Sequence, residues 1–342
     1  MADGLADPVT GGAVDAWDSR VVELAVASSS VTLTQVNRSL CFETEPVPWG
    51  WSPTVAVPRW YLLGVRQVEV DVGYQLAAGV TAGEARVPVV FVNAWGTSQD
   101  QWDRVVAGVG AHTVVTFDRP GVGRSPALPA DLRRRSRTFG ELADEVRRVL
   151  AAVAITSPCV VVGHSIGALI AMAYAARHPE HTAGLVLVDG TTLHHLETTS
   201  WPVFDGGDNQ PGSSMIDIGG SITELGTAAW PMVPAAVLSS AVGRWTRLTP
   251  EEAATYAPLT VAQLDRQWQD GQRVLAEKVG AVLVVADSAG HDVPAEQPEL
   301  VAACVRAVTT AAQQGSTVVS IPAVELPTAG GSVPPPPPAV PH

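Results

Sequence analysis

The chain has 342 residues, of which 46% are hydrophobic and 16% charged, so it has enough apolar material for a buried core and is not globally disordered. Its formal net charge is −13, and such a field would repel a polyanion, so we expect no nucleic-acid partner. The three cysteines, Cys41, Cys159 and Cys304, are odd in number and far apart, which predicts neither a disulfide framework nor a thiolate metal site.

Neither a targeting segment nor a membrane segment is visible in the sequence. The first residues, MADGLADPVTGG, lack a basic stretch followed by an apolar one, so no secretory signal is predicted. No uninterrupted apolar run of about 18 residues occurs, so no membrane span is expected. The default expectation is therefore a cytoplasmic protein, and the sequence does not indicate an oligomeric state.

Residues 1–65 are predicted to be an N-terminal extension packing on the core. The segment VVELAVASSSVTLTQV alternates β-branched and polar residues, which predicts one or two strands. Residues 46–61 are dense in proline and tryptophan, and this composition favours an irregular segment that covers apolar surface.

From residue 66 the sequence predicts the strands of a catalytic domain spanning 66–314. The segment VRQVEVDVGYQLAA alternates with period two, which suits a strand or hairpin with one exposed face. The later candidates are unbroken apolar runs, typical of parallel strands buried on both faces. These runs are PVVFV (88–92), HTVVTF (112–117), CVVVG (159–163), GLVLVD (184–189), PAAVLS (234–239) and AVLVVAD (281–287).

Helical signals lie between most of these strands. Thr138 and Glu141 form a T-x-x-E capping box that begins a helix reaching about Val153. The alternation of strands and helices predicts an α/β fold with a doubly wound, mostly parallel sheet. The other helices are expected over 166–177, from the Thr249-Pro250 start, and over 299–312.

Two stretches, residues 191–232 and 315–342, break this alternation, and one basic run stands apart from them. Residues 191–232 contain no clear strand, and because so long a loop is usually functional, we predict a lid or cap there. Residues 315–342 end in a proline run that cannot bury a core, which predicts a disordered, partly polyproline II tail. The basic run is interpreted as a solvated loop or helix edge rather than a binding patch; it contains Arg133, Arg134, Arg135 and Arg137.

The sequence Gly163-His164-Ser165-Ile166-Gly167 matches G-x-S-x-G between a predicted buried strand and a predicted helix. A turn this tight leaves no room for bulk at the flanking positions, which accounts for both glycines. It forces the serine into a strained conformation with its Oγ exposed above the sheet. The helix N-terminus also directs its partial positive charge at the site. The context therefore predicts Ser165 as a nucleophile.

A serine nucleophile needs a general base. His291 follows the last predicted strand, and in a doubly wound sheet that loop lies at the carboxyl edge, where ligands bind. His194 and His195, at the start of the predicted lid, are the alternatives. His164 is expected to point away from the substrate because its neighbour occupies the tip of the turn.

At this point the chain resembles the α/β-hydrolase superfamily over roughly residues 68–308. The resemblance rests on the G-x-S-x-G turn, on DRPGVGRS (118–125), and on the segments LVLVDG and GHDVPAEQPELV. It implies the α/β-hydrolase fold and a serine hydrolase that needs no metal or organic cofactor. The implied partner is a small-molecule, ester-like substrate with an apolar acyl or alcohol group. Haloalkane dehalogenases and epoxide hydrolases are similar but have aspartate at the position of Ser165 in this turn, so the serine argues against both classes.

The resemblance implies the chain order serine, acid, histidine, with the acid at the end of one of the two strands that follow the nucleophile helix. The later position falls near residues 239–241, where no acid stands, and the earlier one holds Asp189. Asp189 is therefore the implied acid that orients His291. Asp287 and Asp292 remain alternatives, although both are too close in sequence to His291 to reach its ring easily.

The resemblance also implies an oxyanion hole formed by the backbone N–H groups of Ile166 and Trp95. Similar enzymes have His-Gly-x in the loop of Trp95, whereas this chain has Asn93 and Ala94. Alanine disfavours a positive φ, and losing one donor costs about 3–4 kcal/mol of transition-state stabilisation. The alternative hypothesis is therefore a non-catalytic or ligand-sensing member of the fold.

The working hypothesis is a hydrolase that cleaves a carboxylic ester through an acyl-enzyme. Thioesters, lactones and amides remain open within the same mechanism. Five tryptophans either line an apolar acyl pocket or pack in the core and lid, and the sequence supports both interpretations; they are Trp95, Trp201, Trp230, Trp245 and Trp268.

Overall fold

The computed structural model describes residues 21–26, 29–36, 39–43, 64–198 and 212–335. The chain divides into two units, Met1–Ala56 and Val57–His342, and each is described by itself. In the first unit an antiparallel sheet is formed by β1 (Val21–Val26), β2 (Ser29–Val36) and β3 (Ser39–Glu43). The prediction of one or two strands in residues 21–36 is thus confirmed, and β3, which follows that segment, was not predicted. The packing of residues 1–65 on the core stays a prediction, and residues 46–61 lie outside the described residues.

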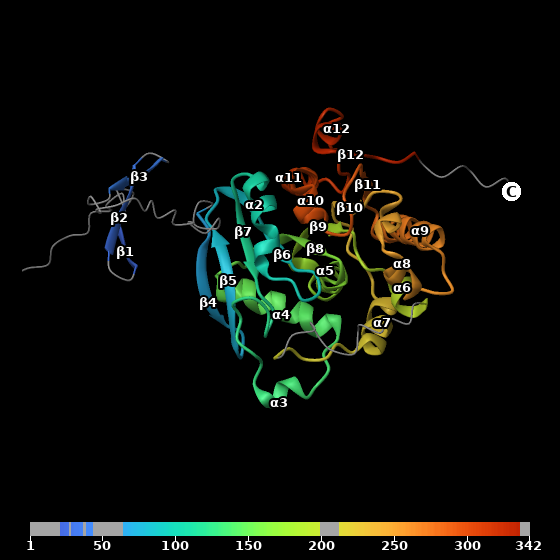
Figure 1. Ribbon diagram of the computed structural model, residues 1–342, viewed down its shortest axis with the longest axis horizontal. Helices are drawn as coiled ribbons and strands as arrows, with labels where there is room; N and C mark the ends of the chain where they lie inside the picture. The colour runs from blue at the N-terminus through green and yellow to red at the C-terminus, as the bar shows by residue number, and fades with distance from the viewer. Residues whose placement is uncertain (1–20, 27–28, 37–38, 44–63, 199–211, 336–342) are drawn as a thin grey trace, which may run out of the picture. The chain divides into compact units, whose positions relative to one another are not determined.

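The second unit is built on a nine-stranded sheet in the order β12-β11-β10-β9-β8-β6-β7-β5-β4 (Figure 1). Strand β5 runs antiparallel to β4 and β7, β12 runs antiparallel to β11, and the other neighbours are parallel. Each predicted strand is confirmed at or near its expected bounds. The strands are β4 (Arg66–Asp71), β5 (Gln75–Thr81), β6 (Ala85–Val92), β7 (His112–Phe117), β8 (Cys159–His164), β9 (Thr182–Val188), β10 (Ala235–Ser239), β11 (Val282–Ala286) and β12 (Gly331–Ser332).

The helices connect these strands and cover both faces of the sheet. The capping box at Thr138 is formed, and α4 begins directly after it. The long helix α9 was not predicted, although Thr260 and Gln263 form the same kind of box at its start. The helices are α2 (Asp103–Val109), α3 (Ala130–Arg133), α4 (Phe139–Ala152), α5 (Ile166–Arg177), α6 (Leu193–Thr198), α7 (Ile218–Thr227), α8 (Pro250–Ala254), α9 (Val261–Val279), α10 (Val293–Glu296), α11 (Pro298–Gln313) and α12 (Glu325–Ala329), with the 3-10 turns η1 (Gln99–Trp102), η2 (Pro179–His181) and η4 (Arg244–Arg247).

Side chains on opposite faces of the sheet enter two separate cores. Every residue of β8 is buried. Val161 joins the core that contains residues of α4 and α5, whereas Val160 and Val162 join the core that contains residues of α2 and α11. This double burial explains why the parallel strands read as unbroken apolar runs. A third cluster, centred on Trp245 and Trp268, joins η4 to α9.

The order in which strands are added to the sheet reverses between the parallel neighbours β6 and β8. From β6 the chain passes to β7 on one side, and from β8 it continues through β9, β10 and β11 on the other. In open α/β sheets, ligands bind outside the carboxyl ends of the strands at such a point. Asn93 follows β6 and Ser165 follows β8, so both predicted loops lie at this position.

The predicted lid, residues 191–232, contains α6 and α7, while residues 199–211 lie outside the described residues. The described part that returns to the sheet is tied to the segment before α4. Ile216 forms a parallel bridge with Arg137, and Leu128 donates a backbone hydrogen bond to the carbonyl of Gly212. Its role as a lid stays a prediction.

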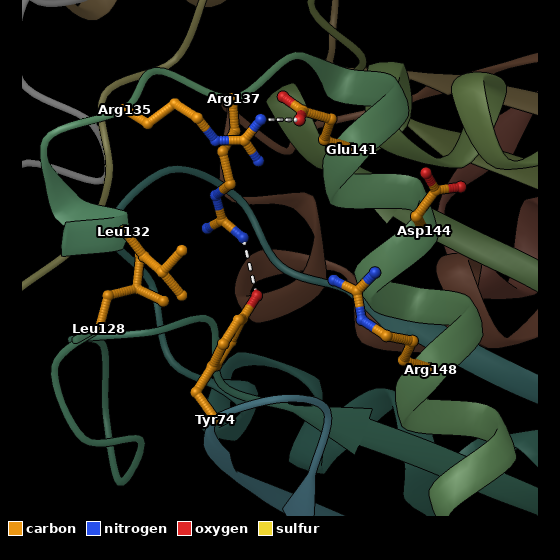
Figure 2. A pocket seen from close by; sticks show the side chains of 8 residues that line it. All are labelled: Tyr74, Leu128, Leu132, Arg135, Arg137, Glu141, Asp144 and Arg148. Carbon is orange, nitrogen blue, oxygen red and sulfur yellow. Dashed lines mark hydrogen bonds and ion pairs between the residues drawn. The ribbon is translucent and has the colours of Figure 1, made fainter.

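The basic run is only partly solvated, which corrects the interpretation of Arg137. Arg133, Arg134 and Arg135 are exposed, but Arg137 is buried and donates to Ser214 Oγ, Tyr74 Oη and Glu145 Oε2. It is buried because the carboxylate of Glu145 compensates its charge, as buried charges require. Arg137 lines a surface pocket of about 140 Å³ between α4 and the Tyr74 turn (Figure 2). We assign no ligand to this pocket.

The predicted disorder of residues 315–342 is wrong for the described part, residues 315–335. These residues form α12 and β12, and β12 pairs with β11 at the edge of the sheet. Leu326 is buried in the core beside α11, and Glu325 forms an ion pair with Arg306. Composition failed here because β12 pairs with β11 and because buried Leu326 and half-buried Val319, Ile321 and Ala329 pack against the core. Residues 336–342 lie outside the described residues.

Candidate active site

Ser165 stands between β8 and α5 in a strained backbone conformation, with φ 56° and ψ −120°. Only a sharp turn holds a non-glycine residue there, at a cost of order 1–3 kcal/mol. A Cβ at Gly163 would approach the carbonyl oxygen of Gly167 to 2.2 Å, and a Cβ at Gly167 would approach that of Val92 to 2.4 Å. Both glycines are therefore required by close backbone approach, as the motif predicts.

His291 lies in the loop between β11 and α10, and its ring contacts the serine. Its Nε2 is 2.9 Å from Ser165 Oγ, and its Nδ1 is 2.7 Å from Asp189 Oδ2. Since an ionised carboxylate only accepts, Nδ1 carries the proton and Nε2 is free to accept from the serine hydroxyl. The His291 side chain is 44% exposed, so this face is open to an incoming molecule.

The loop that carries His291 is tied to the serine turn by its neighbour in the motif. His164 is buried, and its Nε2 donates to the backbone carbonyl of His291 over 2.8 Å. Burial, helped by the nearby charge of His291, lowers the pKa of His164 to about 3. His164 is therefore neutral in the working range of pH and engages the backbone of the histidine loop.

Asp189 directly follows β9 and is fully buried, and its carboxylate accepts four hydrogen bonds. Oδ1 accepts from the backbone N–H of Ser240 at 2.8 Å and from Trp268 Nε1 at 2.7 Å. Oδ2 accepts from His291 Nδ1 at 2.7 Å and from Arg244 Nη1 at 3.0 Å. Burial by itself would raise the pKa of Asp189, but the charge of Arg244 and the bond from His291 hold it well below its usual range.

The geometry brings together Ser165, His291 and Asp189, as the sequence predicts. Asp287 and Asp292 are exposed, and the ring of His291 faces Asp189 instead. The empty acid position after β10 has a different use: Ser240 supplies a backbone donor to Asp189.

Two partners of this carboxylate, Arg244 and Trp268, were not predicted. Trp268 was expected to line an acyl pocket or pack in the core, and it is buried in the cluster that joins η4 to α9. Arg244 begins the turn after β10, at the carboxyl edge of the sheet. Its place shortly after a predicted strand, at the edge where ligands bind, could have marked Arg244 as a candidate site residue. No local pattern marks either residue as a partner of an acid on another strand.

The loop after β6 departs from the family pattern without the expected strain. Ala94 does not adopt a positive φ; the turn places this conformation at Gly96, with φ 64°. The side chain of Asn93 is buried and donates from Nδ2 to the carbonyl of Phe117, while its Oδ1 accepts from Trp102 Nε1. The change from His-Gly to Asn93-Ala94 is therefore absorbed by a hydrogen-bonded loop.

Arg119 and Asp118 support the same loop from β7. Arg119 is buried and donates to the carbonyls of Asn93 and Ala94 at 2.8 and 2.6 Å. Asp118 accepts from the backbone N–H groups of Gln99 and Arg124. The DRPGVGRS turn thus fixes the loop that holds Trp95.

The predicted oxyanion donors come from two loops that lie against each other. A Cβ at Gly167 would meet the carbonyl oxygens of both Val92 and Asn93, so the start of α5 abuts the end of β6. Ile166 is the first residue of α5, and its N–H has no acceptor within the helix. Trp95 is half-buried. The roles of Trp95 and Ile166 as donors stay predictions.

The alternative histidines lie on α6. His195 is buried, and its Nδ1 is 3.0 Å from Thr192 Oγ1 rather than bonded to Ser165. Burial, followed by the charge of His194, lowers the pKa of His195 to about 4. Trp201 lies outside the described residues, and Trp230 is half-buried with Lys278 over its ring.

The thiols of Cys159 and Cys304 are the other candidate reactive groups, and both are protonated near neutral pH. Cys159 and Cys304 are buried, and burial raises the pKa of each thiol to about 12. Within the described ranges, no cluster of three or more histidines, cysteines or carboxylates is arranged to bind a metal. Over the same residues, none of the helices combines the length and apolar character that crossing a bilayer requires.

A family comparison agrees with the fold and the turn after β8. Residues 87–209 match the family model described as alpha/beta hydrolase fold. The sheet order and the G-x-S-x-G turn agree with this match, so the second unit has the α/β-hydrolase fold.

Within that class the chain is similar to proteins with named activities. A pimeloyl-[acyl-carrier protein] methyl ester esterase of Chromobacterium violaceum is 37% identical over 115 residues, covering 33% of this chain and 41% of that protein. A human (lyso)-N-acylphosphatidylethanolamine lipase is 30% identical over 107 residues, covering 30% of each. The chain thus spans about 30–41% of the length of these curated relatives. A crystal structure of a membrane phospholipase A aligns with 75% of this chain and 89% of its own, with a TM-score of 0.49 and 20% identity.

Proposed function

We propose that the chain is a serine hydrolase that cleaves a carboxylic ester through an acyl-enzyme. The observation that carries this proposal is one continuous path of hydrogen bonds. It runs from Ser165 Oγ to His291 Nε2 over 2.9 Å, and from His291 Nδ1 to Asp189 Oδ2 over 2.7 Å. This arrangement can move a proton away from a hydroxyl that a strained turn presents at the carboxyl edge of the sheet.

In the proposed reaction, Ser165 Oγ attacks the ester carbonyl while His291 Nε2 takes the serine proton. The proton is then delivered to the departing alcohol, which leaves the acyl group on Ser165. A water molecule, deprotonated by His291, attacks this acyl-enzyme, and the proton returns to Ser165 as the acid leaves. Asp189 holds the imidazole in the tautomer that both steps need. The N–H groups of Ile166 and Trp95 stabilise the oxyanion.

The choice of an ester rests on the relatives and on the character of the site. Two similar proteins are named for ester cleavage, one as a methyl ester esterase and one as a lipase. The loop that would supply one oxyanion donor also carries the half-buried Trp95, whose indole suits a substrate with an apolar acyl or alcohol group.

The non-catalytic alternative is the weaker of the two hypotheses. Its support was the Asn93-Ala94 pair, because alanine would strain a turn that needs a positive φ. The turn takes that conformation at Gly96, so the objection no longer applies to Ala94. No other feature of the described residues favours a purely sensing role.

Fluorophosphonate labelling tests the proposal without knowledge of the natural substrate. The full chain should bind one equivalent of the probe, and Ser165→Ala should bind none. Ser98→Ala is a matched control, because Ser98 is half-buried near the same loop and makes no side-chain cap bond. Hydrolysis of p-nitrophenyl esters of graded acyl length should disappear with the label. A folded wild-type chain that neither labels nor hydrolyses any ester of the series would overturn the proposal.

A further inference from the structure

Besides the histidine, the proposed acid has a cationic partner, Arg244. Arg244 Nη1 and His291 Nδ1 lie 3.0 and 2.7 Å from the same oxygen, Asp189 Oδ2. The Arg244 side chain is only 8% exposed and Asp189 is fully buried, so solvent screens this pair weakly. A guanidinium is permanently charged, and it therefore offsets the charge of the carboxylate whatever the state of the histidine.

Two indole rings hold the guanidinium in place. Arg244 Cζ lies 4.5 Å from the ring centroid of Trp245 and 4.0 Å from that of Trp268. Trp268 also donates from Nε1 to Asp189 Oδ1 and contacts the His291 ring edge-on, with centroids 5.7 Å apart. One side chain thus touches the acid, its cation and the base.

The backbone that presents Arg244 is anchored on both sides. The N–H of Arg244 donates to the carbonyl of Ala241, and the N–H of Ala241 donates to that of Ala289, two residues before His291. Gly243 donates to Asp265 on α9. The arginine is therefore positioned by the same loop that meets the histidine loop.

We propose that Arg244 is a positioning residue that fixes Asp189 and offsets its charge, so that the proposed reaction continues at lower pH than it would without this arginine. The inference rests on the proposed function. A neutralised acid stabilises an imidazolium less than a lone carboxylate does, because the arginine cation opposes the second positive charge. Since only the neutral imidazole accepts the serine proton, less stabilisation of the imidazolium favours activity toward acid.

Other charged and titratable groups surround the imidazole at greater remove. From β8, His164 is buried and neutral beside the loop, with its ring centroid 5.0 Å from that of His291. On the solvent side, Glu296 accepts from the N–H of Gly290 and pairs with Arg247. His195 of α6 contacts the ring of Trp268. Asp265 of α9 and Tyr256 lie near Arg244. Among the described groups, Arg244 is the cation bonded directly to the acid.

The pH profile of kcat/KM on a p-nitrophenyl ester gives the first test. Arg244→Met should move the acid limb upward by roughly one pH unit and lower kcat, with a smaller effect on KM. Arg244→Lys keeps a cation and should restore most of the wild-type position of the limb. Arg273→Met is the matched control, since it removes one arginine charge from the surface of α9, where Arg273 pairs with Asp270.

A second readout does not require turnover. The proton between His291 Nδ1 and Asp189 should give a low-field NMR signal, and its titration midpoint should rise in Arg244→Met by the same roughly one pH unit as the acid limb. If no variant or wild type hydrolyses an ester, the proposed function fails and this measurement still decides the role of Arg244. Should the methionine variant not fold, Arg244→Gln, which is polar and smaller, takes its place after a thermal melt verifies folding.

An acid limb and an NMR midpoint that stay at their wild-type positions in folded Arg244→Met and Arg244→Gln would overturn the inference. A shift no larger than that of Arg273→Met would also overturn it, because the effect would then be one of net charge alone. A loss of activity that Arg244→Lys fails to restore, with no change in the pH profile, would show a purely structural role.

Discussion

Asp189 and Glu145 are both buried carboxylates, and each is bonded to a buried arginine and to an aromatic donor. Asp189 bonds Arg244 and Trp268, whereas Glu145 bonds Arg137 at 2.7 Å and the hydroxyl of Tyr74. The sets differ in their remaining partners. Both oxygens of Asp189 are fully used, and one donor is a half-exposed histidine beside a strained serine.

Glu145 belongs to a cluster that only holds parts of the fold together. Its Oε1 has no hydrogen-bond partner among the described residues, and its Oε2 joins α4 to the Tyr74 turn and to Arg137. Burial, followed by the charge of Glu145, raises the pKa of Tyr74 to about 12. With this pKa, Tyr74 stays neutral near neutral pH. A buried arginine–carboxylate pair therefore does not by itself mark a reactive site; an accessible proton acceptor in contact with it does.

The sharpest contrast between the two carboxylates comes from removing each charge by amide substitution. Asp189→Asn should lower kcat by up to roughly 10⁴, because the imidazole loses the partner that fixes its tautomer. Glu145→Gln should leave kcat within a few-fold of wild type. Steady-state hydrolysis at saturating ester measures both. If Glu145→Gln lost activity to the same extent while still folded, the distinction between the two sites would be wrong.

The structural cluster should reveal itself in stability rather than in rate. Arg137→Met leaves Glu145 as an uncompensated buried charge and should lower the free energy of unfolding by about 3–5 kcal/mol. The double variant Arg137→Met/Glu145→Leu should lose less, since both charges are removed together. Urea titrations followed by tryptophan fluorescence give both values. A double variant less stable than Arg137→Met would contradict this account.

The smallest expected effect is on the pH dependence of stability and comes from His195, whose ring contacts Trp268. The pKa of His195 is lowered to about 4 in the folded chain and is about 6.5 in an unfolded one. Between these values the unfolded state binds more protons, so stability is present above pH 6.5 and is lost as pH falls toward 4. His195→Gln should weaken this loss by at most about 1.4 kcal/mol per pH unit. Urea titrations at pH 7 and pH 4.5 measure it, and equal losses in variant and wild type would refute it.

Much of the fold could be predicted because its signals are local. The apolar runs marked the strands, and the capping box at Thr138 marked the start of α4. The G-x-S-x-G turn and the histidine after the last long strand placed two groups at one edge of the sheet. Asp189 needed the family order as well, since a strand-end aspartate has no distinctive local pattern.

The missed features depend on contacts between distant segments. Arg244 and Trp268 meet Asp189 only after η4 and α9 have packed against the end of β9. The effect of Ala94 depends on which residue of its loop adopts the positive φ, and Gly96 does so. The C-terminal segment was misjudged because its average composition concealed one buried leucine at position 326.

The two-residue strand β12 has a consequence for the histidine loop. The carboxamide of Gln297 connects them: Oε1 accepts from the N–H groups of Ser288 and Ala289, and Nε2 donates to the carbonyl of Gly330. Shortening the chain before α12 would remove the hydrogen bond from Gln297 to Gly330 and the pairing of β12 with β11. Strand β11 would then be an exposed edge strand, to which a strand of a second molecule could add. Cutting after residue 335 would spare both contacts. The short strand β12 thus covers the edge of the sheet next to the loop that carries His291.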